Sequence, residues 1–260
     1  MAQTAKPRIV SLAPSATRTL WELGAAEHLA GVTRWCKDVV PAEAIAGLPV
    51  VGDCWDLDAQ AVAKLKPDLV IGSVPYRAEA VEGILKQGLR FLAKSPRTLD
   101  DIYGDIRLLS QIVCKTGEGE KLAAKMQTQI AAARERTAAM GKRPRVYCEV
   151  WPNPLRSSER WVEELVEAAG GKFVPCPAGR QVSAEEVIGA DPEIIVLAWA
   201  ATGSRARADV VRRRPGWEQV SAVRNHRIHV FHDETLNTPA PILLEGLQAL
   251  AAAIHPGSFS

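Results

Sequence analysis

Two stretches of the chain repeat the same order of hydrophobic and polar positions. Residues 8–14 and 145–152 are apolar runs that end at a proline, and each is followed by an amphipathic segment that closes on glycine, residues 17–24 in the first case and 161–170 in the second. Such runs predict buried strands, and glycine just past the last helical turn is a common stop signal. We therefore predict a strand and then a helix near the start of each half of the chain.

A second matching unit, a short helix followed by a strand, occurs later in each half. The predicted strands are residues 69–72 and 194–197, which are apolar throughout, and the helices before them begin after Asp58 and Ser183. The side-chain oxygens of those two residues can accept the free N–H groups of a first helical turn. Strands that are apolar on both faces, in alternation with helices, predict an α/β fold with parallel sheets.

The segment between the two halves, residues 98–140, shows no strand pattern. Residues 118–140 are rich in alanine, lysine, glutamate and glutamine, which favour helix, and Leu122, Met126 and Ile130 recur at helical spacing. At 1.5 Å per residue this helix would be about 35 Å long. We expect two similar α/β lobes joined by one long helix, with an N-terminal lobe over 1–97, a connecting segment over 98–142 and a C-terminal lobe over 143–260.

Composition and charge narrow the classes of function. The 260 residues carry a net charge of +2, so no strong field draws the chain to nucleic acid, and the arginine run 212–214 is interpreted as a solvated turn. No segment has the roughly 20 apolar residues that would insert into a bilayer. The first residues lack the apolar core of about 7–15 residues that a secretory signal needs. We therefore expect a cytoplasmic protein, or a periplasmic one if a signal segment has been removed.

Cysteine and histidine spacing predicts no metal site. The five cysteines are odd in number and include no C-x-x-C pair, although a disulfide between Cys36 and Cys54 stays open. His229 lies in a predicted strand between His226 and His232, and a spacing of three on a strand does not bring side chains to one face. No G-x-S-x-G, phosphate loop, H-E-x-x-H or dinucleotide fingerprint occurs. We predict no catalytic residue, no metal and no cofactor, and a protein that is not an enzyme.

Tryptophan is concentrated where the predicted strands end. Tryptophan accounts for seven of the 14 aromatic residues, and it offers a broad, rigid apolar face with one N–H donor. Ligands of open α/β sheets sit beyond the carboxyl ends of the strands. Core packing is an equal alternative for each tryptophan. For Cys36 and Cys54 the favoured alternative is a buried, inert thiol, and for Asp233 and Glu234 it is an ordinary surface turn. The candidate ligand-binding residues are Pro14, Ser15, Trp35, Cys36, Cys54, Trp55, Tyr76, Trp151, Trp199, Asp233 and Glu234.

Four sequence motifs resemble those of a known family. They are SLAPSATRTLWELGAAEHLAGVT, LPVVGD, LDAQAVAKLKPDLVI and VSAEEVIGADPEIIVL. With them the chain resembles, over nearly its whole length, the long-helix (class III) substrate-binding proteins of ABC importers for cobalamin and ferric siderophores. The resemblance implies two Rossmann-like lobes joined by one rigid helix, with a corrinoid or related metal chelate held in the cleft between the lobes.

Other functions compete with a corrinoid-binding protein, which we expect to be a monomer. A haem binder, a ferric-siderophore binder and a cytoplasmic ligand sensor would share the same fold. A chelatase-type enzyme that acts on a tetrapyrrole also uses two α/β lobes, and it needs a histidine and an acidic residue at the metal. Only His232 with Glu234 offers that combination.

Two departures from the family pattern bear on transport and on ligand contacts. Members that dock on an ABC permease carry one glutamate on each lobe. Glu185 matches the second of these positions, whereas Gln60 replaces the first, which puts docking on a permease in doubt. Trp35 matches an aromatic position of the ligand site and Asp233 an acidic one, but Cys54 stands where the resemblance implies an aromatic residue.

Overall fold

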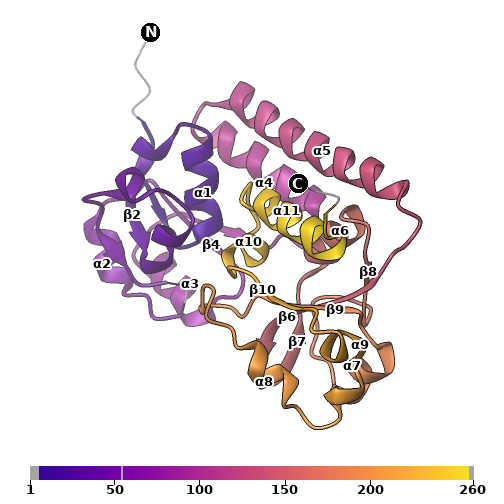
Figure 1. The fold of residues 1–260 in the computed structure, drawn as a ribbon. Helices are drawn as coiled ribbons and strands as arrows, with labels where there is room; N and C mark the ends of the chain where they lie inside the picture. Colours follow the sequence, from indigo (N-terminus) through magenta and orange to yellow (C-terminus); the bar gives the residue numbers. More distant parts are fainter. Residues whose placement is uncertain (1–5, 54, 258–260) are drawn as a thin grey trace. The chain divides into compact units, whose positions relative to one another are not determined.

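The chain divides into two compact units (Figure 1). Unit 1 comprises Met1–Pro96 and Asp100–Ala124, and unit 2 comprises Arg97–Leu99 and Lys125–Ser260. The computed structural model describes residues 6–53 and 55–257, so the candidate Cys54 lies outside the described residues. The predicted connecting segment, residues 98–142, contributes to both units.

Unit 1 is built on a five-stranded parallel sheet. Its strands have the spatial order β3-β2-β1-β4-β5 and are β1 (Ile9–Ser11), β2 (Leu29–Thr33), β3 (Val50–Val51), β4 (Leu69–Ser73) and β5 (Phe91–Lys94). Its helical elements are α1 (Pro14–Glu22), η1 (Ala26–His28), η2 (Arg34–Asp38), η3 (Ala42–Ile45), α2 (Ala59–Lys64), α3 (Ala78–Lys86) and most of α4 (Leu99–Ile112). The hydrophobic pattern predicts β1 and β4 but not the other three strands.

Helices cover both faces of the first sheet. Val10 of β1 and Val70 of β4 pack with Val62 of α2 and Ile84 of α3 on one face. The neighbouring residues of these strands point to the opposite face, where α1 contacts β1, β2 and β4. The Asp58 carboxylate accepts two N–H groups from the first turn of α2, which confirms the predicted cap.

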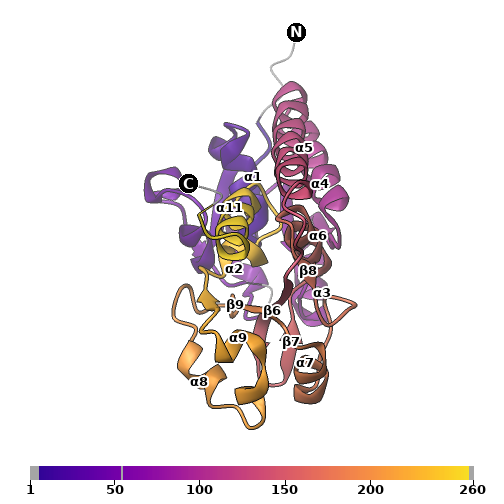
Figure 2. The same cartoon turned by 45° about the vertical axis from the view of Figure 1, so that its right-hand side comes forward.

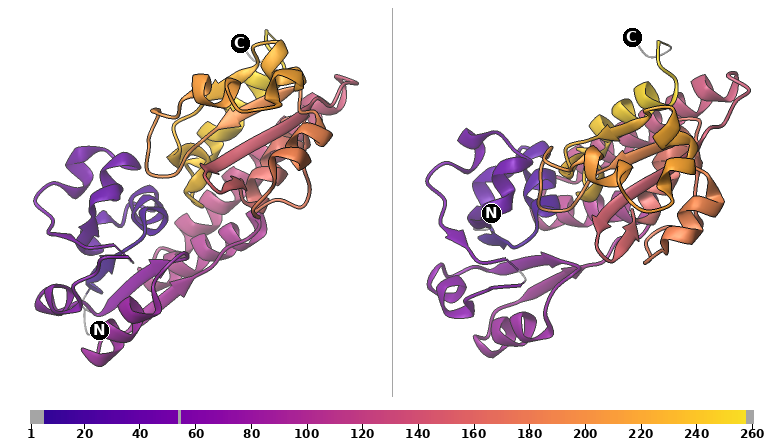
Figure 3. Two further views of the ribbon diagram at one scale, coloured as in Figure 1. Left: turned by 90° about the horizontal axis from the view of Figure 1, so that it is seen from below. Right: turned by 60° about the horizontal axis from the view of Figure 1, so that its bottom comes forward.

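Unit 2 contains a second five-stranded sheet in which β6 is the central and longest strand (Figure 3). The order is β10-β9-β6-β7, with β8 also paired to β6. The strands are β6 (Arg145–Pro152), β7 (Leu155–Ser157), β8 (Lys172–Phe173), β9 (Ile194–Leu197) and β10 (Ile228–Val230). The helical elements are α6 (Arg160–Ala168), α7 (Ala184–Ala190), α8 (Ala208–Arg212), η4 (Trp217–Gln219), α9 (Ser221–Arg224), α10 (Glu234–Asn237) and α11 (Leu243–Ile254).

One strand departs from the parallel arrangement predicted for the second sheet. β7 runs antiparallel to β6 and forms a hairpin with it through residues 153–154. The other paired strands of this sheet are parallel. The sequence 152–154 predicts only a turn. The strand β7 after it is missed, because three residues carry too little pattern to identify a strand.

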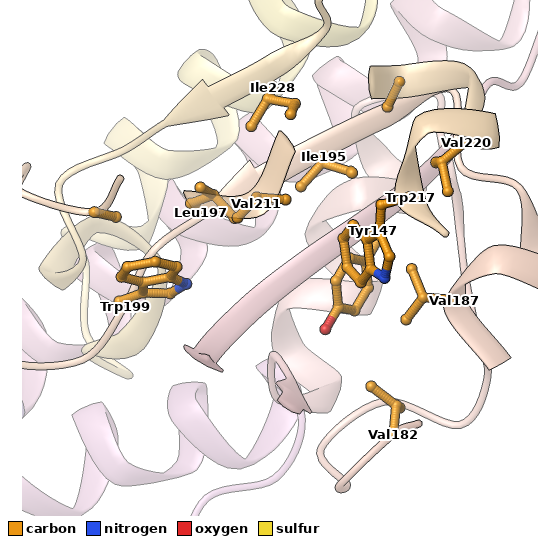
Figure 4. Close-up of a cluster of buried hydrophobic side chains, with 12 residues drawn as sticks. Tyr147, Val182, Val187, Ile195, Leu197, Trp199, Val211, Trp217, Val220 and Ile228 are labelled. Carbon is orange, nitrogen blue, oxygen red and sulfur yellow. The ribbon is translucent and has the colours of Figure 1, made fainter. Parts of the chain in front are cut away.

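The core on one face of the second sheet is a continuous cluster of large side chains (Figure 4). Tyr147 of β6 and Ile195 of β9 pack there with Val187 of α7 and Trp217 of η4. Ser183 caps α7 in a reciprocal arrangement with Glu186, which confirms the predicted N-terminus of that helix. The strand–helix units predicted around residues 145–170 and 182–197 are therefore confirmed, with boundaries shifted by about two residues at the helix ends.

The long helix α5 spans Thr116–Ala138 and belongs to both units. Leu122, Met126 and Ile130 are buried, as their helical spacing predicts. Within unit 1, α4 and the start of α5 lie side by side (Figure 2), and the Arg107 guanidinium pairs with the Glu120 carboxylate at 3.0 Å. A methyl group at Gly119 would collide with the side chain of Ser110, so glycine allows this close approach.

Candidate functional site

The carboxyl ends of the first sheet's strands carry a group of aromatic and charged side chains. Arg34 and Trp35 follow β2 within η2, Asp53 and Trp55 follow β3, and Arg77 follows β4. Parallel strands that end together place their loops at one edge of the sheet, which is where open α/β sheets bind ligands. We refer to these five residues as the first strand-end surface.

Asp53 binds both tryptophans of this surface. Its Oδ2 accepts the indole N–H of Trp35 at 2.9 Å, and its Oδ1 accepts the backbone N–H of Trp55 at 2.9 Å. Partial burial raises the pKa of Asp53, but these two hydrogen bonds and the charge of Arg34 outweigh the burial and hold the pKa below its ordinary value. The carboxylate is therefore ionised at neutral pH and able to accept both bonds.

Each tryptophan of the first strand-end surface lies beside an arginine. The Arg34 guanidinium lies 5.0 Å from the centre of the Trp35 ring, and that of Arg77 lies 5.8 Å from the Trp55 ring. Arg34 also pairs with Asp53 at 3.5 Å. Within the part of the chain that the structure describes, no carboxylate lies within 4 Å of Arg77. Trp55 is 52% exposed, so this surface presents an aromatic face and a cation without an acidic partner.

Four other predicted residues of unit 1 lie at or beneath this edge. Pro14 is half-buried at the start of α1, and Ser15 after it is 3% exposed. Cys36 is fully buried, with its Sγ 3.0 Å from the Thr17 hydroxyl. Tyr76 is half-buried and makes an edge-on contact with Phe91. Ser15 and Cys36 therefore lie beneath the surface and do not face a ligand. For Cys36 this is the buried-thiol alternative.

Sequence reasoning misses a buried ion pair beneath this edge. The Lys94 side chain, at the end of β5, is 1% exposed; its ammonium lies 3.2 Å from the Asp105 carboxylate and donates to Ser15 Oγ at 3.4 Å. Burial lowers the pKa of Lys94 and raises the pKa of Asp105, while their mutual attraction acts in the opposite direction on both. A lysine that ends an otherwise apolar strand is the one sequence signal that could have pointed to it.

The strand ends of unit 2 separate the two tryptophans predicted there. Trp151, at the end of β6, is 44% exposed, and its indole N–H donates to the Asn153 carbonyl at 2.9 Å. Trp199, after β9, is 8% exposed and belongs to the core cluster of Figure 4. Its indole N–H donates to the buried Glu149 carboxylate at 2.8 Å. Trp151 is thus available to a ligand, whereas Trp199 packs the core, the alternative left open for each tryptophan.

The arginine run 212–214 is not wholly a solvated turn. Arg214 points inward, and its guanidinium forms a bidentate pair with the Glu149 carboxylate at 2.7 and 2.8 Å. The same guanidinium lies 4.6 Å from the centre of the Trp217 ring. Arg212 and Arg213 are exposed, so the interpretation holds for two of the three residues. A charge run alone does not indicate which member finds a buried carboxylate.

The acidic pair Asp233 and Glu234 is engaged by its own segment. Asp233 is 3% exposed; its carboxylate accepts the N–H groups of Thr202 at 3.2 Å and Glu234 at 3.1 Å, so it caps α10 and ties down the loop after β9. Burial raises the pKa of Asp233, and the nearby His232 and these N–H groups counteract that rise. The Glu234 carboxylate accepts the Thr238 hydroxyl. Both carboxylates therefore have structural partners within unit 2.

The two residues considered for permease docking occupy equivalent positions in their units. Gln60 lies in the first turn of α2 and Glu185 in the first turn of α7, and both are exposed. Hydrogen bonds from its own backbone N–H and the Ser183 hydroxyl hold the pKa of Glu185 below its ordinary value.

Among residues 6–53 and 55–257, no group of three or more histidine, cysteine, aspartate or glutamate side chains is placed to hold a metal ion.

A comparison with known protein families assigns this fold. The family model for periplasmic binding proteins matches residues 9–235, which is most of the chain. The chain belongs to the periplasmic binding protein family. The resemblance seen in the four sequence motifs is thereby confirmed, as is the predicted α/β fold class.

Relatives of this periplasmic binding protein include a lipoprotein of an ABC transporter, a vitamin-binding protein and a solved structure. An uncharacterised ABC transporter substrate-binding lipoprotein of Bacillus subtilis is 26% identical over 97% of this chain and 81% of its own. A vitamin B12-binding protein of Vibrio parahaemolyticus is 26% identical over 95% of this chain and 89% of its own. The structure of a periplasmic haem-binding protein from Roseiflexus, in its apo form, superposes with a TM-score of 0.83 at 26% identity and covers 98% of this chain and 100% of that one.

The expectation of a cytoplasmic protein is wrong. The family is one of periplasmic binding proteins; the Bacillus subtilis relative is named as a lipoprotein and the Roseiflexus structure as periplasmic. The expectation rested on the absence of a signal-like start, which is a weaker observation than membership of the family. Across the described residues, no helix combines the length and the apolar character needed to cross a membrane.

Proposed function

We propose that this periplasmic binding protein binds a corrinoid or a closely related metal chelate at the carboxyl ends of its strands. The observation that carries the proposal is the first strand-end surface itself, where one carboxylate bonds to the ring of Trp35 and to the backbone of Trp55, and each tryptophan lies beside an arginine. Flat, bulky ligands are recognised by rigid aromatic area with a few placed polar groups. The names of the relatives, which bind vitamin B12 or haem, agree with a ligand of this kind.

Binding without catalysis is the second part of the proposal. The chelatase alternative needs His232 and Glu234 to face a metal, but the Glu234 carboxylate already bonds to Thr238 and the neighbouring Asp233 caps α10. A general base must reach the proton that it removes, and engaged carboxylates are poorly placed to do so. We therefore assign no catalytic residue and no resident cofactor, and the metal chelate is the cargo.

Delivery to an ABC permease is the proposed use of the bound ligand. Glu185 supplies an exposed carboxylate in the first turn of α7, whereas Gln60 offers a neutral amide at the equivalent turn of α2. Charged rim residues act chiefly on encounter rate and register. We expect Gln60→Glu to raise the association rate with a cobalamin-type permease in low salt, and Glu185→Gln to lower it. If Gln60 instead makes its own contact with the permease, Gln60→Glu should weaken the association.

A titration with three ligand classes tests the proposed function. Cyanocobalamin, haemin and a ferric hydroxamate siderophore are added separately to the protein, and the quenching of tryptophan fluorescence is followed to saturation. We expect one tetrapyrrole-type ligand to bind saturably, with the affinity reduced by Trp35→Ala and unchanged by Trp21→Ala, a half-buried tryptophan of α1. Failure of all three ligands to bind would reject the proposal, and binding of the siderophore alone would select that alternative.

A further inference from the structure

Asp53 bonds to both tryptophans of the first strand-end surface, although its own side chain is largely buried. Its side chain is 12% exposed, while Trp55 two residues later is 52% exposed. One oxygen accepts the Trp35 indole N–H and the other the Trp55 backbone N–H, both at 2.9 Å. Trp35 follows β2 and Trp55 follows β3, so a single carboxylate links the loops of two neighbouring strands.

The surrounding contacts keep this carboxylate in place. Asp56 Oδ1 accepts the backbone N–H of Asp53 at 2.9 Å. The Arg34 guanidinium lies 3.5 Å from Asp53 Oδ2 and 3.7 Å from Asp56 Oδ2. A methyl group at Gly52 would come within 2.6 Å of the Asp56 carbonyl oxygen, so the backbone at Gly52 lies close to the backbone at Asp56. These contacts therefore fix the position of Asp53.

The bond to Trp35 decides which part of that ring remains for a ligand. An indole has one hydrogen-bond donor, and here it points to Asp53. The ring is then held in one orientation by a charge-assisted bond, with the Arg34 guanidinium 5.0 Å from its centre. What Trp35 retains for a ligand is its apolar area. Ordering such a side chain before binding removes an entropic cost of association.

We propose that Asp53 is the positioning residue of the ligand site: it holds the ring of Trp35 and the backbone of Trp55, and so presets an aromatic platform for a flat ligand. This inference rests on the proposed function, because a platform needs a ligand. Neither tryptophan depends on Asp53 for burial in the core, since Trp55 is exposed and Trp35 is only half-buried. The carboxylate therefore serves the shape of the surface more than the packing of unit 1.

Three variants of the full-length protein test the inference. Asp53→Ala removes both acceptors, Asp53→Asn leaves one carbonyl oxygen to share between two donors, and Asp58→Ala removes a nearby loop carboxylate that caps α2 without contacting either tryptophan. The first measurement is hydrogen exchange of the Trp35 indole N–H by NMR without ligand. We expect Asp53→Ala to accelerate it on the order of tenfold, Asp53→Asn by less, and Asp58→Ala not at all.

The second measurement is the affinity for cyanocobalamin, with haemin as the alternative probe. We expect Asp53→Ala to lower the affinity on the order of tenfold and Asp58→Ala to leave it unchanged. Unchanged exchange at Trp35 in Asp53→Ala, or a loss of affinity no larger than that of Asp58→Ala, would overturn the inference. If neither probe binds the unmodified protein, the proposed function fails with the ligand role of Asp53, while the exchange measurement still decides whether Asp53 holds Trp35.

Discussion

Arg214 and Glu149 form a bidentate ion pair whose two N–H···O distances are 2.7 and 2.8 Å, and the Glu149 side chain is completely buried. The pair joins the segment after α8 to the central strand β6. The same carboxylate accepts the indole N–H of Trp199 at 2.8 Å. One buried charge in unit 2 is thus satisfied by three donors that come from two segments.

Removal of Arg214 should destabilise the protein strongly. Arg214→Ala leaves the Glu149 carboxylate buried without its cation, and breaking a buried pair from one side costs about 3–5 kcal/mol. The free energy of unfolding, from urea denaturation followed by far-UV circular dichroism, measures this. Arg213→Ala is the matched control, because Arg213 and its partner Asp209 both lie on the surface. We expect this variant to lose less than about 1 kcal/mol of unfolding free energy. Equal losses in the two variants would contradict the role given to Arg214.

The Lys94–Asp105 pair predicts a pH-dependent effect. In Lys94→Met, Asp105 loses the neighbouring cation that lowers its pKa, so burial raises that pKa further above its ordinary value of 3.8. A carboxyl whose folded-state pKa is raised stabilises the fold below the unfolded pKa, and that contribution is lost as the pH rises through the folded pKa. Lys94→Met should therefore cost about 3 kcal/mol at pH 7 and clearly less at pH 4.

Urea denaturation at both pH values measures this difference between the variant and the unmodified protein. Lys86→Met is the control, since Lys86 pairs with Glu82 on the exposed surface of α3 and should give a small effect at either pH. A loss for Lys94→Met that is constant from pH 4 to pH 7 would show that packing, not the ion pair, accounts for it.

The parts of the fold that the sequence predicts have a helical spacing of apolar residues, a helix-capping residue or a continuous apolar run. The spacing of Leu122, Met126 and Ile130 is enough to identify α5, and Asp58 and Ser183 cap their helices as expected. The strand β3 has two residues and β8 also two, so no alternation can be read from them. Their pairing is decided by the neighbouring strands, which a local pattern does not record.

The candidate surface could be predicted only in part for a similar reason. Residue type and loop position give Trp55, Trp151 and Trp199 the same description, although the first two are exposed and the third is buried. Trp199 is drawn inward because Glu149, 50 residues earlier, lies buried where it can accept the indole N–H. A local sequence pattern contains no signal for such a long-range hydrogen bond. The bond between Asp53 and Trp35 is missed on the same ground.

The two tryptophans of unit 2 should respond differently to substitution. Trp151→Ala removes a 44% exposed ring, so we expect a small change in stability and a weaker affinity for the tetrapyrrole ligand. Trp199→Phe keeps an aromatic ring in the core but takes one donor from Glu149, which should cost about 1–2 kcal/mol of stability. Its effect on affinity should be small. Denaturation and fluorescence titration of both variants check this, and a weakened ligand in Trp199→Phe but not in Trp151→Ala would reverse the assignment.

Arg77 predicts how the site responds to the charge of its ligand. Its guanidinium lies over Trp55, and no carboxylate of the described residues is within 4 Å of it. A ligand carboxylate could take that place, with a gain of up to about 1 kcal/mol for an exposed pair, or roughly fivefold in affinity. Haemin should therefore bind more tightly than its dimethyl ester, and Arg77→Gln should remove most of that preference without changing the affinity for the ester.

Because exposed pairs are screened by salt, the preference should also shrink between about 0.05 and 0.5 M salt. Lys86→Gln serves as the control for the loss of one positive charge elsewhere on unit 1. A preference that survives in Arg77→Gln would place the ligand's carboxylates away from Trp55 and assign that arginine to the orientation of the ring alone.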